Sequence, residues 1–358
     1  MRALNIFQID YVEFYVANAF QSAIFYKEVL GFTIIGINNP NFGIANQISY
    51  ILQQGNIRLI LTSSFDKKSS IYKHVMLHGD SVKDIAFTTN NLSEDFSFVQ
   101  HNGGKFLLPP SIIQDETHSL RTFSIATCCG DITHSFIERS IENWFIPGYL
   151  PLNICSNTTV GFIDIDHIAL ALPRDNLPIG ISFYQNVLGF HKSHEEDVFL
   201  DKGGMKSAVV SSESSVIKFP LVSPMGELNL SQIDKYLNYN NGPGVQHIAF
   251  LSDDILHSTQ ILKNNGIQFL EVPDSYYASL SLDMIAYLKH KIDNIKKLQI
   301  LLDGAPNHIL MQIFSKPILT LPTFFIEVIQ RYSHYGFGSG NIKALFEAVA
   351  RDQEKQQV

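Results

Sequence analysis

The chain has 358 residues, of which 45% are hydrophobic and 17% charged, and its formal net charge at pH 7 is -8. Such a composition is that of a globular protein and excludes a disordered chain, and the acidic balance argues against a nucleic-acid partner, because phosphate contacts need a basic surface. No apolar run reaches the roughly 18 residues of a membrane span, and the N-terminus lacks the pattern of a secretory signal. We therefore expect no membrane partner.

The cysteine content and the length bear on compartment and domain number. The three cysteines, Cys128, Cys129 and Cys155, form a sparse and odd-numbered set that suits a reducing cytosol, so we expect a cytoplasmic protein. The length exceeds that of one small core. We expect two domains, residues 1–150 and residues 151–358.

The first half of the chain predicts two similar units. A strand-like run at residues 10–16 precedes a helix-length stretch, and Gly31 is its expected terminator. A second strand-like run at residues 82–87 precedes another helix-length stretch, which Asn102-Gly103 leads into an apolar strand. The unit closes with residues 135–138. Residues 139–161, which contain Pro147, Gly148 and Pro151, are typical of an interdomain linker.

The second half repeats this order. Residues 166–170 correspond to 10–16, residues 187–190 to 29–32, and residues 245–250 to 82–87. Asn265-Gly266 again follows a helix-length stretch and predicts an apolar strand. Residues 325–327, with the phenylalanine before them, correspond to 135–138. Self-similarity of this kind indicates a duplication, with βαβββ-type units twice in each half, and thus an α+β fold.

Three strand-like segments of the second half carry His167, His247 and Glu327. Two imidazoles and one carboxylate form the facial triad that holds non-haem Fe(II) and leaves positions open. A single histidine in an apolar strand is commonly a hydrogen-bonded core residue instead. A glutamate in such a strand needs a cation or a metal, because a buried carboxylate without a partner is costly.

The repeat indicates which half holds the metal. At the corresponding positions the first copy has Tyr11, Asp84 and Glu138, with Arg139 or another cation as a partner for the glutamate. Only the second copy offers two imidazoles. We therefore expect the metal in the second domain and none in the first.

Four segments resemble the 4-hydroxyphenylpyruvate dioxygenase family, which includes 4-hydroxymandelate synthase. They are residues 166–168, 244–250, 325–331 and 336–348, and the resemblance runs in order over essentially the whole chain. It implies a vicinal oxygen chelate (glyoxalase/bleomycin-resistance-like) fold. In this fold, each of two domains is an open, curved barrel of paired βαβββ modules, and Fe(2+) lies in the second barrel.

The resemblance also implies residue roles. The implied Fe(2+) ligands are His167, His247 and Glu327. The implied polar catalytic residues are Ser207, Gln232, Gln246 and Gln312. The implied substrate-binding residues are Val222, Phe314, Phe325, Phe337, Asn341 and Ile342. Taken singly, each of these pocket residues has an ordinary alternative as core or surface. The final helix, about residues 341–353, either closes over the pocket or simply packs on the barrel.

The implied partners are an α-keto acid and O₂. Exposed barrel edges often pair, so we also name a homodimer as an expected assembly. Members of the family decarboxylate 4-hydroxyphenylpyruvate oxidatively and then hydroxylate either the ring, giving homogentisate, or the benzylic carbon, giving 4-hydroxymandelate. Val222 and Ile342 resemble the synthases, whereas Pro220 resembles the dioxygenases and Ser223 departs from both. We expect 4-hydroxymandelate; the alternatives are homogentisate and another α-keto acid substrate. An extradiol ring-cleaving dioxygenase would share the triad, and a metal-free binding module of the same fold would not need it.

Overall fold

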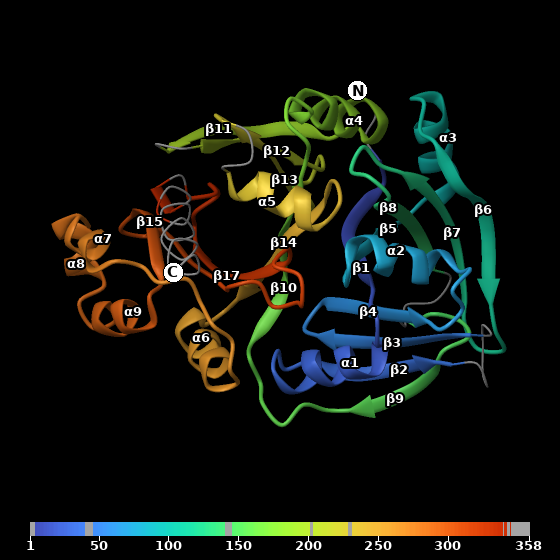
Figure 1. The fold of residues 1–358 in the computed structure, drawn as a ribbon, viewed down its shortest axis with the longest axis horizontal. Helices are drawn as coiled ribbons and strands as arrows, with labels where there is room; N and C mark the ends of the chain where they lie inside the picture. The colour runs from blue at the N-terminus through green and yellow to red at the C-terminus, as the bar shows by residue number, and fades with distance from the viewer. Residues whose placement is uncertain are drawn as a thin grey trace.

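The chain forms two curved, mixed β-sheets with helices packed around them (Figure 1). The structure is a computed structural model, and it describes residues 4–39, 46–139, 145–200, 203–227, 231–338, 340, 341 and 344. Ile342 and most of the predicted final helix lie outside the described residues.

The first sheet is built from two βαβββ units joined by a helix. The first unit comprises β1 (Ile6–Tyr15), α1 (Ala19–Glu28), β2 (Thr33–Asn38), β3 (Gln47–Gln54) and β4 (Ile57–Ser64). After α2 (Ser70–His78), the second unit comprises β5 (Ser81–Thr89), α3 (Leu92–His101), β6 (Phe106–Gln114), β7 (Ser119–Ala126) and β8 (Thr133–Arg139). Among the described residues the strand order is β6-β7-β8-β5-β1-β4-β3-β2-β9.

The second sheet repeats this plan. Its first unit comprises β10 (Phe162–Ala171), α4 (Leu177–Leu188), β11 (His191–Leu200), β12 (Gly203–Ser211) and β13 (Lys218–Met225). After α5 (Gln232–Tyr239), its second unit comprises β14 (Gly244–Ser252), α6 (Ile255–Asn264), β15 (Leu301–Ala305), β16 (His308–Phe314) and β17 (Phe325–Tyr332). The described strands follow the order β11-β12-β13-β10-β14-β17-β16-β15.

Strand pairing makes the two sheets equivalent. In each sheet the first strands of the two units pair antiparallel at the centre, β1 with β5 and β10 with β14. Each of these strands also pairs in parallel with the last strand of its own unit, for example β5 with β8 and β14 with β17. The predicted duplication is thus present at the level of the sheet, and β10, β14 and β17 are neighbours.

Two predicted segments differ from the structure. The expected strand after Asn265-Gly266 is reduced to one bridge between Phe269 and Ser315. It is followed by the short helices α7 (Asp274–Ala278), α8 (Leu282–Tyr287) and α9 (Ile292–Leu298). The predicted linker contains β9 (Leu150–Ile154), which pairs with β2. Both segments depend on distant partners, which a local pattern does not reveal.

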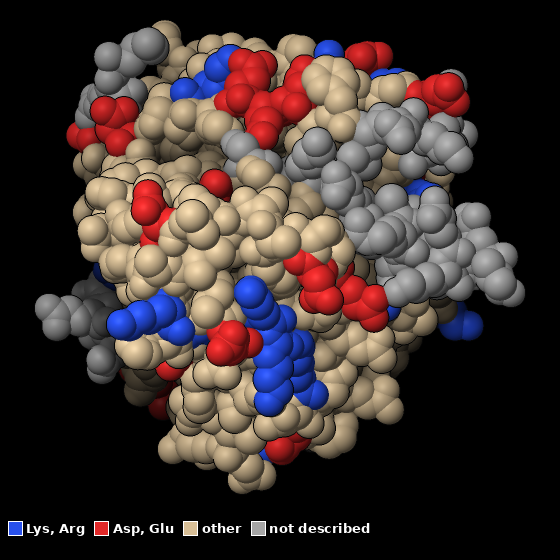
Figure 2. All heavy atoms as spheres, turned by 90° about the vertical axis from the view of Figure 1, so that its left-hand side faces the viewer, with Lys and Arg blue, Asp and Glu red and all other residues tan. Residues whose placement is uncertain are grey.

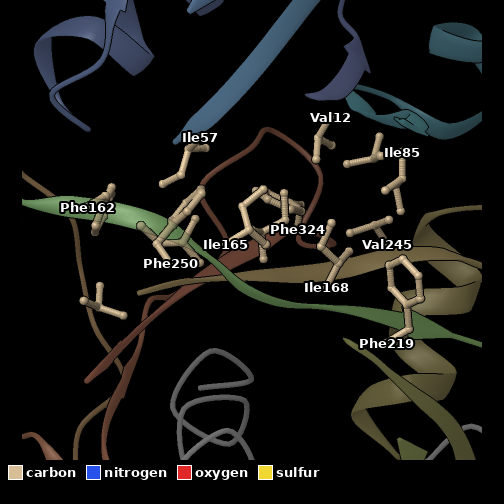
Figure 3. Packing of buried hydrophobic residues seen from close by; sticks show 14 of the residues in the cluster. Val12, Ile57, Ile85, Phe162, Ile165, Ile168, Phe219, Val245, Phe250 and Phe324 are labelled. Carbon is tan, nitrogen blue, oxygen red and sulfur yellow. The ribbon is translucent and has the colours of Figure 1, made fainter. Parts of the chain in front are cut away.

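The two sheets pack against each other through one shared apolar core. Val12 and Ile85 of the first sheet lie in the same buried cluster as Ile168 and Val245 of the second (Figure 3). The rings of Phe14 and Phe324 meet edge to face, with centroids 5.3 Å apart. Because side chains alternate between the faces of a strand, burying Ile168 against the first sheet turns the adjacent His167 toward the inside of the second.

The outer face of the second domain is mixed in charge. Figure 2 shows this face, which carries α7, α8 and α9 in Figure 1, with small groups of Lys and Arg beside Asp and Glu. No helix in the part of the chain that the structure describes is both long and apolar enough to cross a membrane.

Candidate metal centre

The three predicted ligands meet because of the strand register. His167 on β10 is paired with Ala249 on β14, and Ala249 is paired with Glu327 on β17. His247 lies two residues before Ala249 and therefore on the same face of β14. A register shift between Ile165 and His167 marks a bulge next to the first ligand; bulges of this kind re-aim a side chain beside a site.

The ligand atoms converge on one point. Nε2 of His167 is 3.2 Å from Oε2 of Glu327, Nε2 of His247 is 3.6 Å from the same oxygen, and the two Nε2 atoms are 3.4 Å apart. Ligands on one face of an octahedron with bonds of about 2.1 Å would lie roughly 3 Å from each other. The three side chains are buried. Their spacing fits a single metal ion with small adjustments.

Hydrogen bonds leave both Nε2 atoms without a proton when the rings are neutral. His167 Nδ1 is 2.8 Å from Asp166 Oδ1, and His247 Nδ1 is 3.2 Å from Oε1 of Gln246. Each acceptor oxygen requires the N–H at Nδ1, as is usual for metal-binding histidines. Two imidazole lone pairs and a carboxylate then face each other in a buried space, which is a chemical environment that needs a cation.

The pKa values reflect the same arrangement. Burial by itself would lower the pKa of the His167 imidazole, but the carboxylates of Glu327 and Asp166 outweigh it and raise that pKa above its ordinary value. Burial, together with the charge of His167, holds the pKa of His247 well below its ordinary value. The site therefore favours one positive charge at this point and disfavours two protonated imidazoles.

An aspartate and an arginine hold His167 from behind. Arg331 donates from Nε to Asp166 Oδ2 (2.6 Å) and from Nη2 to Asp166 Oδ1 (2.8 Å), which is a bidentate pair. Nη1 of the same arginine donates to the carbonyl oxygens of His334 and Gly336. The guanidinium lies 5.6 Å from the ring centre of Phe337, whose ring is 5.4 Å from that of His167. Arg331 thus links the ligand to the loop that carries Phe337.

Gln312 and Asn341 hold the carboxylate ligand. Gln312 on β16 donates from Nε2 to Glu327 Oε1 at 2.9 Å, which leaves Oε2 directed at the two imidazoles. Asn341 donates in turn to Gln312 Oε1 at 2.8 Å, and its own Oδ1 accepts from the hydroxyl of Tyr276. Residues of β16, of the α7 segment and of the chain after β17 therefore converge on one carboxylate.

The ligands lie in the wall of a cavity that contains most of the predicted pocket residues. The predicted residues that line it are Ser207, Val222, Gln232, Gln246, Gln312, Phe314, Phe325 and Phe337. Asn341 is buried behind Gln312 and is not part of the lining, so a direct contact with substrate at that position does not follow from this arrangement. Ile342 lies outside the described residues.

Four further lining residues were not predicted: His194, Met205, Val209 and Pro220. His194 is on β11 and pairs with Val209 on β12, and Pro220 on β13 pairs with Val209 from the other side. The pairing of three adjacent strands brings these residues to one wall. Alternation along residues 205–209 was a signal for Met205 and Val209, since they share a face with the predicted Ser207.

A second group of possible metal ligands consists of His74, His78 and Asp131. His74 Nδ1 is 2.7 Å from Asp131 Oδ2, and the ammonium of Lys83 is 3.6 Å from the same oxygen. Asp131 is 44% exposed. The charge of the Asp131 carboxylate is thus already balanced by Lys83, and its exposed part is open to solvent. Among the described residues, Glu327 has only imidazoles as charged partners, so the first group is the better metal site.

The first sheet shows that one sequence correspondence was wrong. Tyr11 is paired with Ala86, and Ala86 with Ser135, so Ser135 and not Glu138 occupies the place of Glu327. Glu138 corresponds to Gln330. Glu138 Oε2 accepts from the first N–H of α3, at Leu92, and Gln330 Oε1 accepts from the first N–H of α6, at Ile255. The cation expected beside Glu138 was Arg139 or another one; it is Arg121, at 3.1 Å, and Arg139 pairs with Asp10 instead.

Comparisons with known proteins agree with this geometry. The chain matches the Glyoxalase/Bleomycin resistance protein/Dioxygenase superfamily over residues 8–107 and 164–286. It is 33% identical to a 4-hydroxyphenylpyruvate dioxygenase of Yarrowia lipolytica, with 97% of this chain and 92% of the relative covered. It is 34% identical to one of Dictyostelium discoideum, with 96% and 98% covered. The chain belongs to the 4-hydroxyphenylpyruvate dioxygenase family.

A solved structure of the same family supports the fold. A triple mutant of 4-hydroxymandelate synthase from Streptomyces coelicolor superimposes with a TM-score of 0.85 and 28% identity, covering 98% of this chain and 100% of that chain. The predicted α+β, vicinal oxygen chelate fold is confirmed, as is the prediction of an oxygenase of this family. The relatives carry both names, dioxygenase and synthase, so family membership leaves the product open.

Proposed function

We propose that the protein is an Fe(II)-dependent oxygenase that decarboxylates 4-hydroxyphenylpyruvate oxidatively with O₂ and hydroxylates it. The observation that carries this proposal is the convergence of His167, His247 and Glu327 at the wall of a mainly apolar cavity. The names of the relatives supply the substrate. All three ligands belong to residues 151–358, which we propose as the catalytic domain, with residues 1–150 as a domain without metal.

Iron fits the donor set. Two imidazole nitrogens and one carboxylate oxygen on one face are the arrangement used for Fe(II) in non-haem oxygenases. Bound there, Fe(II) would supply the open coordination positions and the oxygen chemistry that amino-acid side chains lack.

The protein itself positions and encloses the reactants. Phe325 stacks on His247 with ring centres 4.7 Å apart and, with Phe314 and Phe337, offers flat apolar surface to an aryl ring. Ser207, Gln232 and Gln246 offer a hydroxyl and two amides from other parts of the wall to polar groups of the substrate. The remaining apolar lining excludes water from the reacting groups.

Of the two products, we propose 4-hydroxymandelate, with homogentisate as the equally supported alternative. Val222 on β13 supports the first, because it lies opposite Ser207 in the cavity wall and presents an aliphatic surface to the ring. The relatives named dioxygenases support the second. Orientation of the ring relative to the reacting oxygen would decide between them.

The test is identification of the product by mass spectrometry. The full chain is loaded with Fe(II) without oxygen, given 4-hydroxyphenylpyruvate and then exposed to O₂. 4-Hydroxymandelate is the expected product, homogentisate would select the alternative, and no CO₂ release above an iron-free control would refute the oxygenase proposal. Val222→Asn should shift the product ratio toward ring hydroxylation by up to about tenfold, since single pocket groups discriminate on this scale.

A further inference from the structure

The cavity has a polar wall on β11 that none of the roles above uses. The inward face of β11 carries His194, Glu196 and Val198. Their partners on β12 are Val209, Ser207 and Met205, in that order, and all three line the cavity. Residues directly opposite in an antiparallel pair share a face. His194 and Glu196 therefore face the cavity side of the sheet.

This wall is separate from the metal ligands. The strand order β11-β12-β13-β10 puts β11 at the edge of the sheet, three strands from the strand that carries His167. At roughly 4.8 Å per strand this is about 14 Å along the curved sheet. The ring of His194 is 6.2 Å from that of Phe337, which itself contacts His167. A molecule that lies along Phe337 can reach from the metal ligands to β11.

Two polar atoms of this wall are buried and lack hydrogen bonds. Among the described residues, His194 Nε2 and Glu196 Oε2 have no hydrogen-bond partner. They lie 3.6 Å apart, which is within the range of an ion pair when the imidazole is protonated but too long for a direct hydrogen bond. The side chain of His194 as a whole is 35% exposed and that of Glu196 is 19% exposed. Buried polar atoms without partners are rare and costly, so each calls for a bound group.

We propose that His194 and Glu196 form a subsite for a hydroxyl group at the end of the substrate away from the metal. The inference rests on the proposed function, because it assigns the distal end of the same α-keto acid. An ionised carboxylate only accepts hydrogen bonds, whereas an imidazole N–H donates. A hydroxyl donates to Glu196 and accepts from His194 at once. A distal carboxylate would be repelled by Glu196, and an unsubstituted ring would leave both atoms unpaired.

The test compares two acids that differ only in this hydroxyl, 4-hydroxyphenylpyruvate and phenylpyruvate. Oxygen uptake by the iron-loaded full chain gives kcat/KM for each. We expect His194→Phe and Glu196→Gln each to lower the preference for the hydroxylated acid by about tenfold or more, as for loss of a hydrogen bond to a charged group. The value for phenylpyruvate should stay within about threefold, because that acid makes no hydrogen bond at this subsite.

Two substitutions on the same strand serve as controls. His191 and Glu195 are exposed, so His191→Phe and Glu195→Gln repeat the chemical changes outside the cavity and should leave the preference unchanged. Glu196→Gln is nearly isosteric and keeps the fold even where His194→Phe does not. His194→Gln keeps a donor and should restore part of the preference.

The outcomes separate the subsite from the reaction. A preference that stays within twofold of the wild type in Glu196→Gln overturns the subsite. Binding of both acids to the wild type and to Glu196→Gln without oxygen, measured calorimetrically, decides the same point without turnover. If the wild type takes up oxygen with neither acid, the proposed function is refuted instead. If the wild type binds the two acids equally well, only the subsite is refuted.

Discussion

The two sheets share one frame, but at the equivalent position the described residues offer two imidazoles and a carboxylate in the second sheet alone. In the first, Arg139 pairs with Asp10 beside Tyr11; in the second, Arg331 pairs with Asp166 beside His167. The bulge before the position of Tyr11 recurs before His167. The Asp–Arg pair and the bulge therefore belong to the fold, and in the second sheet they also hold His167, a predicted ligand.

The first sheet fills the equivalent space with its own hydrogen bonds. Asp84 stands where His247 does, and its Oδ1 accepts from Thr133 at 2.6 Å. Glu13 accepts from Thr62, and burial raises the pKa of Glu13 to about 7. A carboxylate that holds a proton or accepts from hydroxyls needs no metal. The comparison teaches that this strand arrangement can bring three side chains together in either sheet. It offers a metal site where two of the three positions hold histidines.

The largest expected effect is loss of the metal when the carboxylate ligand is changed. Glu327→Gln should reduce iron content and turnover by more than about 100-fold, because loss of a residue that merely orients a ligand already costs about 10–100-fold. Atomic absorption and oxygen uptake measure both. Glu138→Gln is the matched control; it changes a helix-capping residue and should leave iron binding intact. Iron loss in Glu138→Gln would contradict the register-based correspondence.

A smaller effect is expected from the residue behind His167. Asp166→Asn should lower iron affinity by about 10–100-fold, since the amide no longer fixes the Nδ1–H form of the ring or pairs with the arginine charge. Competition with a chelator measures the affinity. Asp10→Asn makes the same change in the first sheet and should leave iron per folded chain unchanged. Equal losses in both variants would mean that the pair acts only through folding.

The smallest effect is on stability and depends on pH. The pKa of Glu13 is raised from 4.5 to about 7 in the folded state, so the folded chain binds more protons than the unfolded chain between these values. Stability from this group is therefore lost as pH rises from about 4.5 through 7, by about 2 kcal/mol between pH 5 and pH 8.

Glu13→Gln should remove this part of the pH dependence. Urea unfolding at pH 5 and pH 8 measures it as the difference between wild type and variant. The variant should gain stability relative to the wild type as pH rises. Parallel curves for the two proteins would show that Glu13 is ionised in the folded state, with a pKa near its ordinary value.

Much of the fold was predictable because segments that occur in both halves of the sequence support each other's assignment. The strands that contain Asp10 and Asp166 and the turns at Gly31 and Gly189 were visible as repeats, and both glycines adopt positive φ. The helices α7 to α9 and the strand β9 were not predicted, because each occurs in only one half. A segment without a counterpart offers only local propensity, and distant contacts override it.

By itself, the sequence revealed the duplication and predicted that the second half binds the metal, with His167, His247 and Glu327 as the expected ligands. Only the tertiary structure decided which residues lie side by side on neighbouring strands. Ser135 occupies the position equivalent to Glu327, although the local sequence similarity suggests Glu138. It also placed His194 opposite Val209 and Glu196 opposite Ser207, on the side of the sheet that faces the cavity. The physical reason is that hydrogen-bond register between strands sets these neighbours, and a strand does not encode its register alone.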